Sequence, residues 1–189
     1  TEALQRAQHD PRVVGIFARV GAAPMGMAVI QELRDAIIAF QQEGKFAVAH
    51  AETFGEFGPG SGSYYLATSF EEIYLQPSGD LGLTGIMYES PFLRMALDKL
   101  HIQPRLSKRK EYKNAANLFT EDSYTDAHRE SVSTLMNAQF LQLVDGIGQA
   151  RRMAADGVRA LMEDAPLSSQ DALDGGLIDG LYYRDEVSE

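Results

Sequence analysis

Residues 105–113 have the most unusual composition in the chain, with five cations among nine residues of an acidic protein. Burial and neighbouring positive charges both lower the pKa of a lysine, and a neutral amine can accept a proton at physiological pH. Lys113 is the best candidate for such a base, because the apolar residues of segment 115–119 would cover its backbone while residues 108–110 stay in water. The alternative interpretation is a solvated loop.

A serine hydroxyl is the group on which such a base would act, and Ser61 is the candidate nucleophile. It lies in a glycine-rich turn, residues 58–63, that leads into a short predicted helix over residues 64–68. Serine with lysine is a known substitute for the Ser-His-Asp triad, and the amides of a helix N-terminus can stabilise an oxyanion. The alternative is structural, with Ser61 or Ser63 capping the helix.

Other kinds of site find less support in the sequence. Ser63 stands where a dinucleotide-binding fingerprint needs its third glycine, and Pro59 and Ser63 flank Ser61 where a Gly-x-Ser-x-Gly elbow needs glycines. The four histidines form no metal-binding pair, so we predict neither a metal nor a cofactor. His50, at the end of a predicted strand, is interpreted as a structural histidine, with a general base as the alternative.

The apolar pattern predicts an α/β fold with repeated strand-helix-strand units. A β-branched block over 13–18, a helical repeat over 29–40 closed by Gly44 and a second strand over 46–49 imply a mostly parallel sheet. The longest helix is predicted to begin after Thr125. Further elements are expected as a strand over 73–75, a helix over 92–100, a strand over 102–106, and short helices over 158–163 and 169–173.

Length and composition limit the class of protein. With 189 residues, 44% of them hydrophobic, the chain can fold as one domain over residues 1–189. Its 17 basic and 27 acidic side chains leave a net charge of −10, which argues against partners such as nucleic acid or an anionic membrane surface. The lack of cysteine excludes disulfides and thiol catalysis. No stretch is apolar enough to span a membrane. The chain starts without Met, so we expect it to be a piece of a longer protein.

Several motifs, taken in order, resemble a known family. The sequence is similar over about residues 12–187 to signal peptide peptidase A, or protease IV, a bacterial family of serine proteases. The separation of 52 residues between the candidate serine and lysine fits the pattern of that family. The motifs that carry the resemblance are Ser61-Gly62-Ser63-Tyr64-Tyr65, Ile73-Tyr74-Leu75-Gln76-Pro77, Gly82-Leu83-Thr84-Gly85-Ile86 and Tyr112-Lys113.

The resemblance implies a crotonase-like or Clp-protease-like fold and a Ser-Lys dyad made of Ser61 and Lys113, with no cofactor. It also implies a peptide substrate, such as the remnant of a signal peptide, and assembly into a homo-oligomer. Backbone amides at Gly26 and Gly62 would contribute to the oxyanion hole. Family members are tethered to the bacterial inner membrane by a segment absent from this chain and face the periplasm or the cell exterior.

The chain departs from the family pattern near the nucleophile. Ser63 replaces a glycine, Ala23-Pro24-Met25-Gly26 stands where active domains have Ser-Pro-Gly-Gly, and Leu83 stands where short members have a serine. Long members carry two tandem domains, with the lysine in the first and the working serine in the second, and segment 111–120 is more similar to the first. Two alternatives therefore stay open for the nucleophile, which are Ser61 and a serine in a domain outside this chain.

Two other classes of function also stay open. The first is a noncatalytic scaffold of the same family, whose role is oligomerisation and in which Ser61 is structural and the basic segment lies in solvent or at an interface. The second is an acyl-thioester enzyme of the crotonase type. The sequence has no adenine-binding signal for coenzyme A, which argues against the second.

Overall fold

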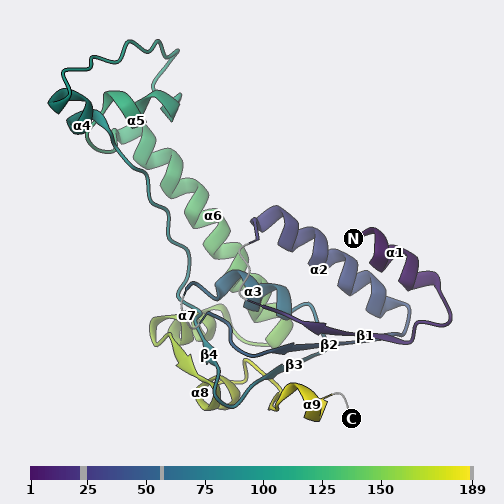
Figure 1. Ribbon diagram of the computed structural model, residues 1–189. Coiled ribbons are helices and arrows are strands. Elements are labelled where there is room, and N and C mark those ends of the chain that lie inside the picture. Colours follow the sequence, from purple (N-terminus) through teal and green to yellow (C-terminus); the bar gives the residue numbers. More distant parts are fainter. Residues whose placement is uncertain (22–24, 56–57, 188–189) are drawn as a thin grey trace. The chain divides into compact units, whose positions relative to one another are not determined.

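The computed structural model describes residues 1–21, 25–55 and 58–187 (Figure 1). It divides the chain into two compact units, unit 1 with residues 1–85 and 142–189 and unit 2 with residues 86–141. The elements of unit 1 are α1 (Glu2–His9), β1 (Gly15–Arg19), α2 (Met27–Gln42), β2 (Phe46–Ala51), α3 (Ser61–Ala67), β3 (Glu72–Leu75), β4 (Asp80–Leu81), α7 (Ala155–Glu163), β5 (Leu167–Ser168), α8 (Ser169–Asp174), β6 (Gly180–Leu181) and α9 (Arg184–Val187). Those of unit 2 are α4 (Arg94–Lys99), the 3-10 helix η1 (Asn114–Ala116) and α5 (Asn117–Thr120), and α6 (Asp126–Arg151) begins in unit 2 and ends in unit 1.

The centre of unit 1 is a sheet in the order β1-β2-β3-β6, in which every neighbouring pair is parallel. The connections between these strands contain helices, as parallel pairing requires. Gly44, which follows α2, has φ of +76°, a backbone conformation that glycine adopts readily and that ends a helix. The prediction of strand-helix-strand units around a parallel sheet is therefore confirmed.

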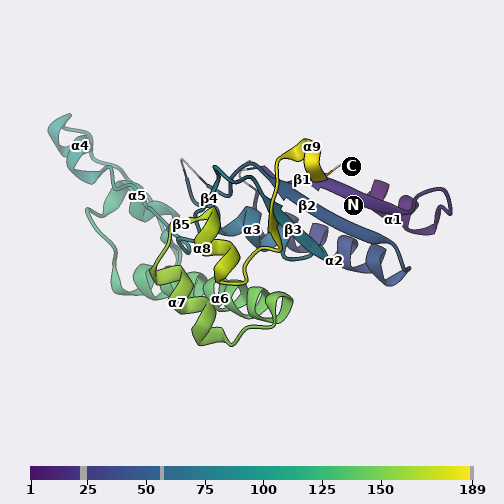
Figure 2. The ribbon, with the colours of Figure 1, turned by 90° about the horizontal axis from the view of Figure 1, so that it is seen from below.

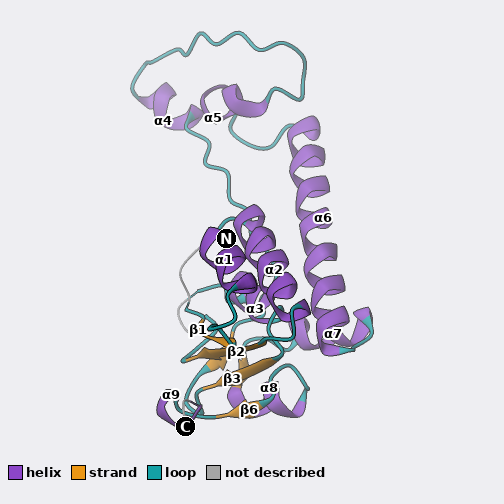
Figure 3. Ribbon diagram, turned by 90° about the vertical axis from the view of Figure 1, so that its right-hand side faces the viewer, coloured by secondary structure: helices purple, strands orange, loops and turns teal. Residues whose placement is uncertain are grey.

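The two faces of this sheet differ in what covers them. Helices α2 and α3 lie over one face (Figures 1 and 3). Ala47, Ala49, Ile73 and Leu75 alternate along β2 and β3 and are fully buried, as side chains that point to a covered face should be. The opposite face carries larger side chains that are partly exposed and is approached by α9 (Figure 2).

Unit 2 is built on a small aromatic and polar cluster. Phe92 packs edge-on against Tyr124, with ring centroids 5.2 Å apart, and both rings contact His128. Thr125 precedes α6, and its hydroxyl accepts a hydrogen bond from the amide of His128 at 3.3 Å, which is the N-terminal cap predicted from the sequence. The cluster therefore joins the first turn of α6 to the chain before α4.

Most predicted helices and strands are present, with ends that differ from the prediction. One predicted strand, over residues 102–106, is absent. Ile102 and Leu106 are each 50% exposed there, because no neighbouring strand in the described part of unit 2 takes up their backbone groups. The short strands β4, β5 and β6 were not predicted.

Within the described ranges, no helix is both long enough and apolar enough to cross a membrane.

Candidate active site

A tight turn between β2 and α3 carries Ser61. The amide of Gly60 donates to the carbonyl of Gly82 at 2.8 Å, and the amide of Gly82 donates to the carbonyl of Phe54 at 2.7 Å. A Cβ atom added to Gly60 would lie 1.7 Å from the Phe54 oxygen, so only glycine fits next to the candidate nucleophile. Backbone packing within unit 1 therefore holds the residue that precedes α3.

Ser61 is the first residue of α3 and is 3% exposed. Its Oγ accepts a hydrogen bond from the amide of Gly85 at 3.0 Å. The hydroxyl donates no hydrogen bond among the described residues, so its proton has no acceptor there. A base that reached this site could therefore take that proton.

The structural alternative for the two serines, a helix cap, is wrong. The helix begins at Ser61, its N-cap residue is Gly60, and no side chain makes a cap hydrogen bond. Ser63 Oγ donates to the carbonyl of Gly60 at 3.0 Å, which is the opposite direction from a cap. Ser63 thus reinforces the turn that holds Ser61.

A buried tyrosine in the middle of α3, Tyr64, also holds this helix in position. Tyr64 is fully buried, and its hydroxyl donates to the carbonyl of Leu177 at 2.6 Å. Burial raises the pKa of this phenol, so it stays protonated at neutral pH. The motif Ser61-Gly62-Ser63-Tyr64 is thereby anchored to the C-terminal part of the chain.

The two candidate oxyanion residues begin neighbouring helices. Gly26 is the N-cap of α2, and Gly62 lies in the first turn of α3. A Cβ atom added to Gly62 would lie 3.2 Å from Cδ1 of Ile30, one turn after Gly26. The first amides of both helices lack partners within the helix and are the type of donor that an oxyanion needs. Ala23 and Pro24, which belong to the same predicted segment, lie outside the described residues.

Lys113 belongs to unit 2, where it precedes the 3-10 helix η1. Its side chain is exposed, so the burial expected from segment 115–119 is not provided within unit 2. Lys108 is exposed as well, but its amine has polar partners. Its amine donates to Asn117 Oδ1 at 2.9 Å and lies 3.8 Å from a carboxylate oxygen of Glu121. The expectation that residues 108–110 stay in water is confirmed, because all three are exposed.

Buried polar contacts hold the segment around Lys113. Asn117 is fully buried and, besides Lys108, its amide group lies 3.5 Å from both Thr125 Oγ1 and His128 Nδ1. Tyr112, next to Lys113, donates its hydroxyl to Glu130 at 2.7 Å, and this hydrogen bond raises the pKa of the phenol. Lys113 is thus exposed, but the backbone segment that carries it is held in place by side-chain contacts.

His50 is fully buried at the end of β2. Its Nε2 lies 3.1 Å from the carbonyl oxygen of Tyr182, which can only accept, so Nε2 is the donor of this hydrogen bond. Nδ1 is buried without a partner among the described residues. The contact to Tyr182 agrees with a structural role, in joining β2 to the segment after β6.

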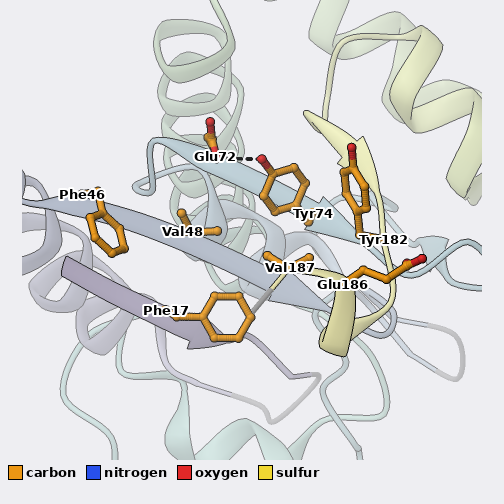
Figure 4. Close-up of a pocket in the computed structure, with 8 residues that line it drawn as sticks. All are labelled: Phe17, Phe46, Val48, Glu72, Tyr74, Tyr182, Glu186 and Val187. Carbon is orange, nitrogen blue, oxygen red and sulfur yellow. Dashed lines mark hydrogen bonds between the residues drawn. The ribbon is translucent and has the colours of Figure 1, made fainter. Parts of the chain in front are cut away.

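A groove of about 520 Å³ lies on the open face of the sheet (Figure 4). Tyr74 and Tyr182 meet edge-on with centroids 5.2 Å apart, and Tyr74 donates to Glu72 at 2.7 Å. This hydrogen bond to a carboxylate raises the pKa of Tyr74 to about 12. The sequence analysis missed this groove, although alternate residues along β1, β2 and β3 point into it. It is lined by Phe17, Phe46, Val48, Glu72, Tyr74, Tyr182, Glu186 and Val187.

Comparison with known proteins identifies the family. Residues 39–189 match the family described as peptidase family S49, and the chain belongs to this family. It is 25% identical over 187 residues to the chloroplastic serine protease SPPA of Arabidopsis thaliana, which covers 99% of this chain and 27% of that protein. It is 26% identical over 199 residues to protease 4 of Salmonella typhi, covering 99% of this chain and 31% of that protein.

The chain is also similar to a further curated relative and to a solved structure. Protease 4 of Haemophilus influenzae is 24% identical over 157 residues, covering 82% of this chain and 25% of that protein. The chain therefore spans only a quarter to a third of the length of these curated relatives. A crystal structure of an enoyl-CoA hydratase/isomerase family protein from Silicibacter pomeroyi matches 92% of this chain and 84% of its own, with a TM-score of 0.29 and 15% identity.

Proposed function

We propose that this chain is a serine endopeptidase domain in which Lys113 acts as the general base of a Ser-Lys pair. The observation that carries the proposal is that the region matching peptidase family S49 holds a buried serine, Ser61, whose hydroxyl proton has no acceptor among the described residues. In the proposed reaction, the neutral amine takes that proton while the serine oxygen attacks the scissile carbonyl. The protonated amine then donates to the leaving nitrogen, and water hydrolyses the acyl-enzyme.

The amine must be neutral to act, and a water-exposed ammonium has no lone pair to accept a proton. Because Lys113 is exposed on unit 2, its proposed role requires a further surface that covers it. We propose that a second copy of the chain or another domain covers Lys113. The same surface would bring either Ser61 or a serine outside this chain to the amine. A homo-oligomer or a longer protein would supply such a surface.

The expected substrate is a peptide, with remnants of signal peptides as the candidate class. The family resemblance of the sequence motifs is what suggests this substrate class, together with a place at the bacterial inner membrane, facing the periplasm or the cell exterior. Attachment to that membrane would need a segment outside residues 1–189. The backbone amides at Gly26 and Gly62 would stabilise the oxyanion, and one such donor is worth roughly 3 to 4 kcal/mol.

Substitution of the lysine tests the proposal. Lys113→Ala should lower kcat/KM for a fluorogenic peptide by about 100-fold or more, the size of a general-base contribution. Lys99→Ala is the matched control, because it removes the same charge from an exposed position in unit 2. Unchanged turnover in Lys113→Ala would refute the assigned role.

Labelling with a fluorophosphonate identifies the nucleophile. Labelling that Ser61→Ala abolishes and Ser63→Ala retains would assign Ser61. Activity that depends on Lys113 but survives Ser61→Ala would assign a serine outside this chain.

The scaffold is the second candidate, and the exposure of Lys113 is the observation that favours it. A scaffold would sediment as an oligomer, would not react with the fluorophosphonate, and would support the activity of a partner domain equally well with Lys113→Ala. Dependence of that activity on Lys113 would exclude the scaffold.

A further inference from the structure

A buried arginine in unit 1 has no carboxylate partner among the described residues. Arg34, on α2, is 8% exposed. Its Nη1 donates to the carbonyl of Tyr65 and, at 2.6 Å, to Thr68 Oγ1, and its guanidinium carbon lies 3.9 Å from the centre of the Tyr65 ring. These contacts hold the guanidinium against the last turn of α3, where helix carbonyls attract a cation.

The charge of Arg34 is only partly compensated by these contacts. Across the described residues, no Asp or Glu oxygen lies within 4.0 Å of its guanidinium, although Arg151 in the same unit has such a partner in Asp179 at 2.9 Å. Burial lowers the pKa of Arg34, which expresses the cost of removing the cation from water. An anion at this position would therefore be favoured.

The guanidinium lies in a cleft of about 480 Å³ between α2, the end of α3 and the last part of α6. In a chain with 27 acidic side chains, the lining of this cleft contains none. Gln42 and Gln149 are exposed at the cleft, and Gln41 is held by a bond from its amide to the carbonyl of Ser69 at 2.7 Å. The cleft thus presents one cation and neutral amide groups. Its lining residues are Arg34, Ile38, Gln41, Gln42, Thr68, Ser69, Gly146, Gln149 and Ala150.

The donor geometry selects a type of anion. Nη1 is used inside the protein, whereas the N–H groups on Nε and Nη2 make no hydrogen bond within the described part of the chain. These two nitrogens form the edge of the guanidinium that pairs with both oxygens of a carboxylate.

We propose that this cleft binds a carboxylate, held by Nε and Nη2 of Arg34. The carboxylate can belong to a small free acid or to the C-terminus of a peptide, whose backbone the glutamine side chains would contact. The site is on unit 1 and does not depend on Lys113 or on the proposed peptidase activity.

Three probes distinguish the sources of the carboxylate. They are acetate, N-acetyl-Ala-Ala with a free C-terminus, and N-acetyl-Ala-Ala-amide, which differs only in lacking the charge. Each is titrated into the full chain, and the Nε–H resonance of Arg34 is followed by NMR. We expect a saturable shift with the two acids and none with the amide. Tighter binding of the peptide acid assigns a peptide C-terminus, and equal affinities assign a small free carboxylate.

Variants assign the binding to Arg34. Binding by the variants is followed through backbone amide resonances of cleft residues such as Gln149, because Arg34→Gln and Arg34→Lys lack the Nε–H of Arg34. Arg34→Gln should weaken the binding of both acids by about tenfold or more, the loss of a hydrogen-bonded charge pair. Arg34→Lys, which keeps the charge but not the paired donors, should fall between Arg34→Gln and the unchanged chain. Arg6→Gln is the matched control, because it removes one exposed charge of the same kind from unit 1.

Two results would overturn the proposal. The first is an absence of saturable shifts with either acid, and the second is equal binding by Arg34→Gln and Arg6→Gln. The amide spectrum of each variant reports its fold. If Arg34→Gln fails to fold, the titration of the unchanged chain together with Arg34→Lys decides the question.

Discussion

The turn that carries Ser61 and the segment that carries Lys113 are built in different ways. Ser61 is buried, and its surroundings include backbone groups of Phe54, Gly60, Gly82 and Gly85, which pack so closely that glycine is required at position 60. Lys113 is exposed, and side chains such as Asn117 hold its segment. Unit 1 by itself therefore holds the candidate nucleophile in place. The candidate base, in contrast, would need a further surface to cover it before its amine could be neutral.

The largest effect on folding is expected for Gly60→Ala. The new methyl group would collide with the carbonyl oxygen of Phe54, so the free energy of unfolding should fall by about 3 kcal/mol. Gly58→Ala is the control, because no atom of the described residues beyond its chain neighbours lies within 4 Å of its added Cβ, and it should change this free energy by no more than about 0.5 kcal/mol. Urea denaturation measures both. Equal stabilities of the two variants would contradict the view that the Ser61 turn is set by backbone packing.

A smaller effect is expected for Asn117→Ala in unit 2. The substitution leaves the amine of Lys108 and the partners on α6 without their amide, and should lower the free energy of unfolding by about 2 kcal/mol. Hydrogen exchange should then become faster over residues 114–120 and stay unchanged in α3. Asn137→Ala, at an exposed position of α6, serves as the control. Unchanged exchange over residues 114–120 would show that Asn117 does not hold the Lys113 segment.

The smallest effect is expected for Glu130→Gln. The carboxylate of Glu130 holds the pKa of Tyr112 above the ordinary value, so its loss should bring that pKa down toward about 10. Because the folded pKa is raised, the contribution of this bond to stability is present below about pH 10 and is lost as the pH rises through the folded value.

Absorbance near 295 nm follows the titration of Tyr112, with Tyr112→Phe identifying its signal. Glu32→Gln, an exposed substitution in unit 1, should leave the titration of Tyr112 unchanged. An unaltered titration in Glu130→Gln would show that the hydrogen bond does not persist in solution.

Patterns of near neighbours in the sequence predicted much of the fold. The repeat over 29–40 and the glycine at 44 predicted α2, and Thr125 correctly marked the start of α6. The strand predicted over 102–106 is absent because apolar residues form a strand only where another strand pairs with them. The crotonase-like character of the fold and the single domain over residues 1–189 stay predictions.

The candidate site was predictable to a similar extent. Ser61, Lys113, Gly26 and Gly62 were proposed from motifs, but their catalytic roles stay predictions. Which lysine of this run has polar partners could not be read from the sequence. The partners of Lys108 are Asn117 and Glu121, nine and thirteen residues further along the chain.

The class of fold could be predicted from the sequence alone, because local periodicity and cap residues depend on near neighbours. The family resemblance and the candidate residues could be predicted in the same way, because these depend on an ordered set of motifs. Folding decided the environment of every candidate. It placed a carbonyl against Gly60, left the Ser61 proton without an acceptor in the described chain, exposed Lys113, and buried Arg34 beside a cleft with no acidic lining. Burial and hydrogen bonding arise from segments far apart in the chain, and the chemistry of a serine, a lysine or an arginine follows from them.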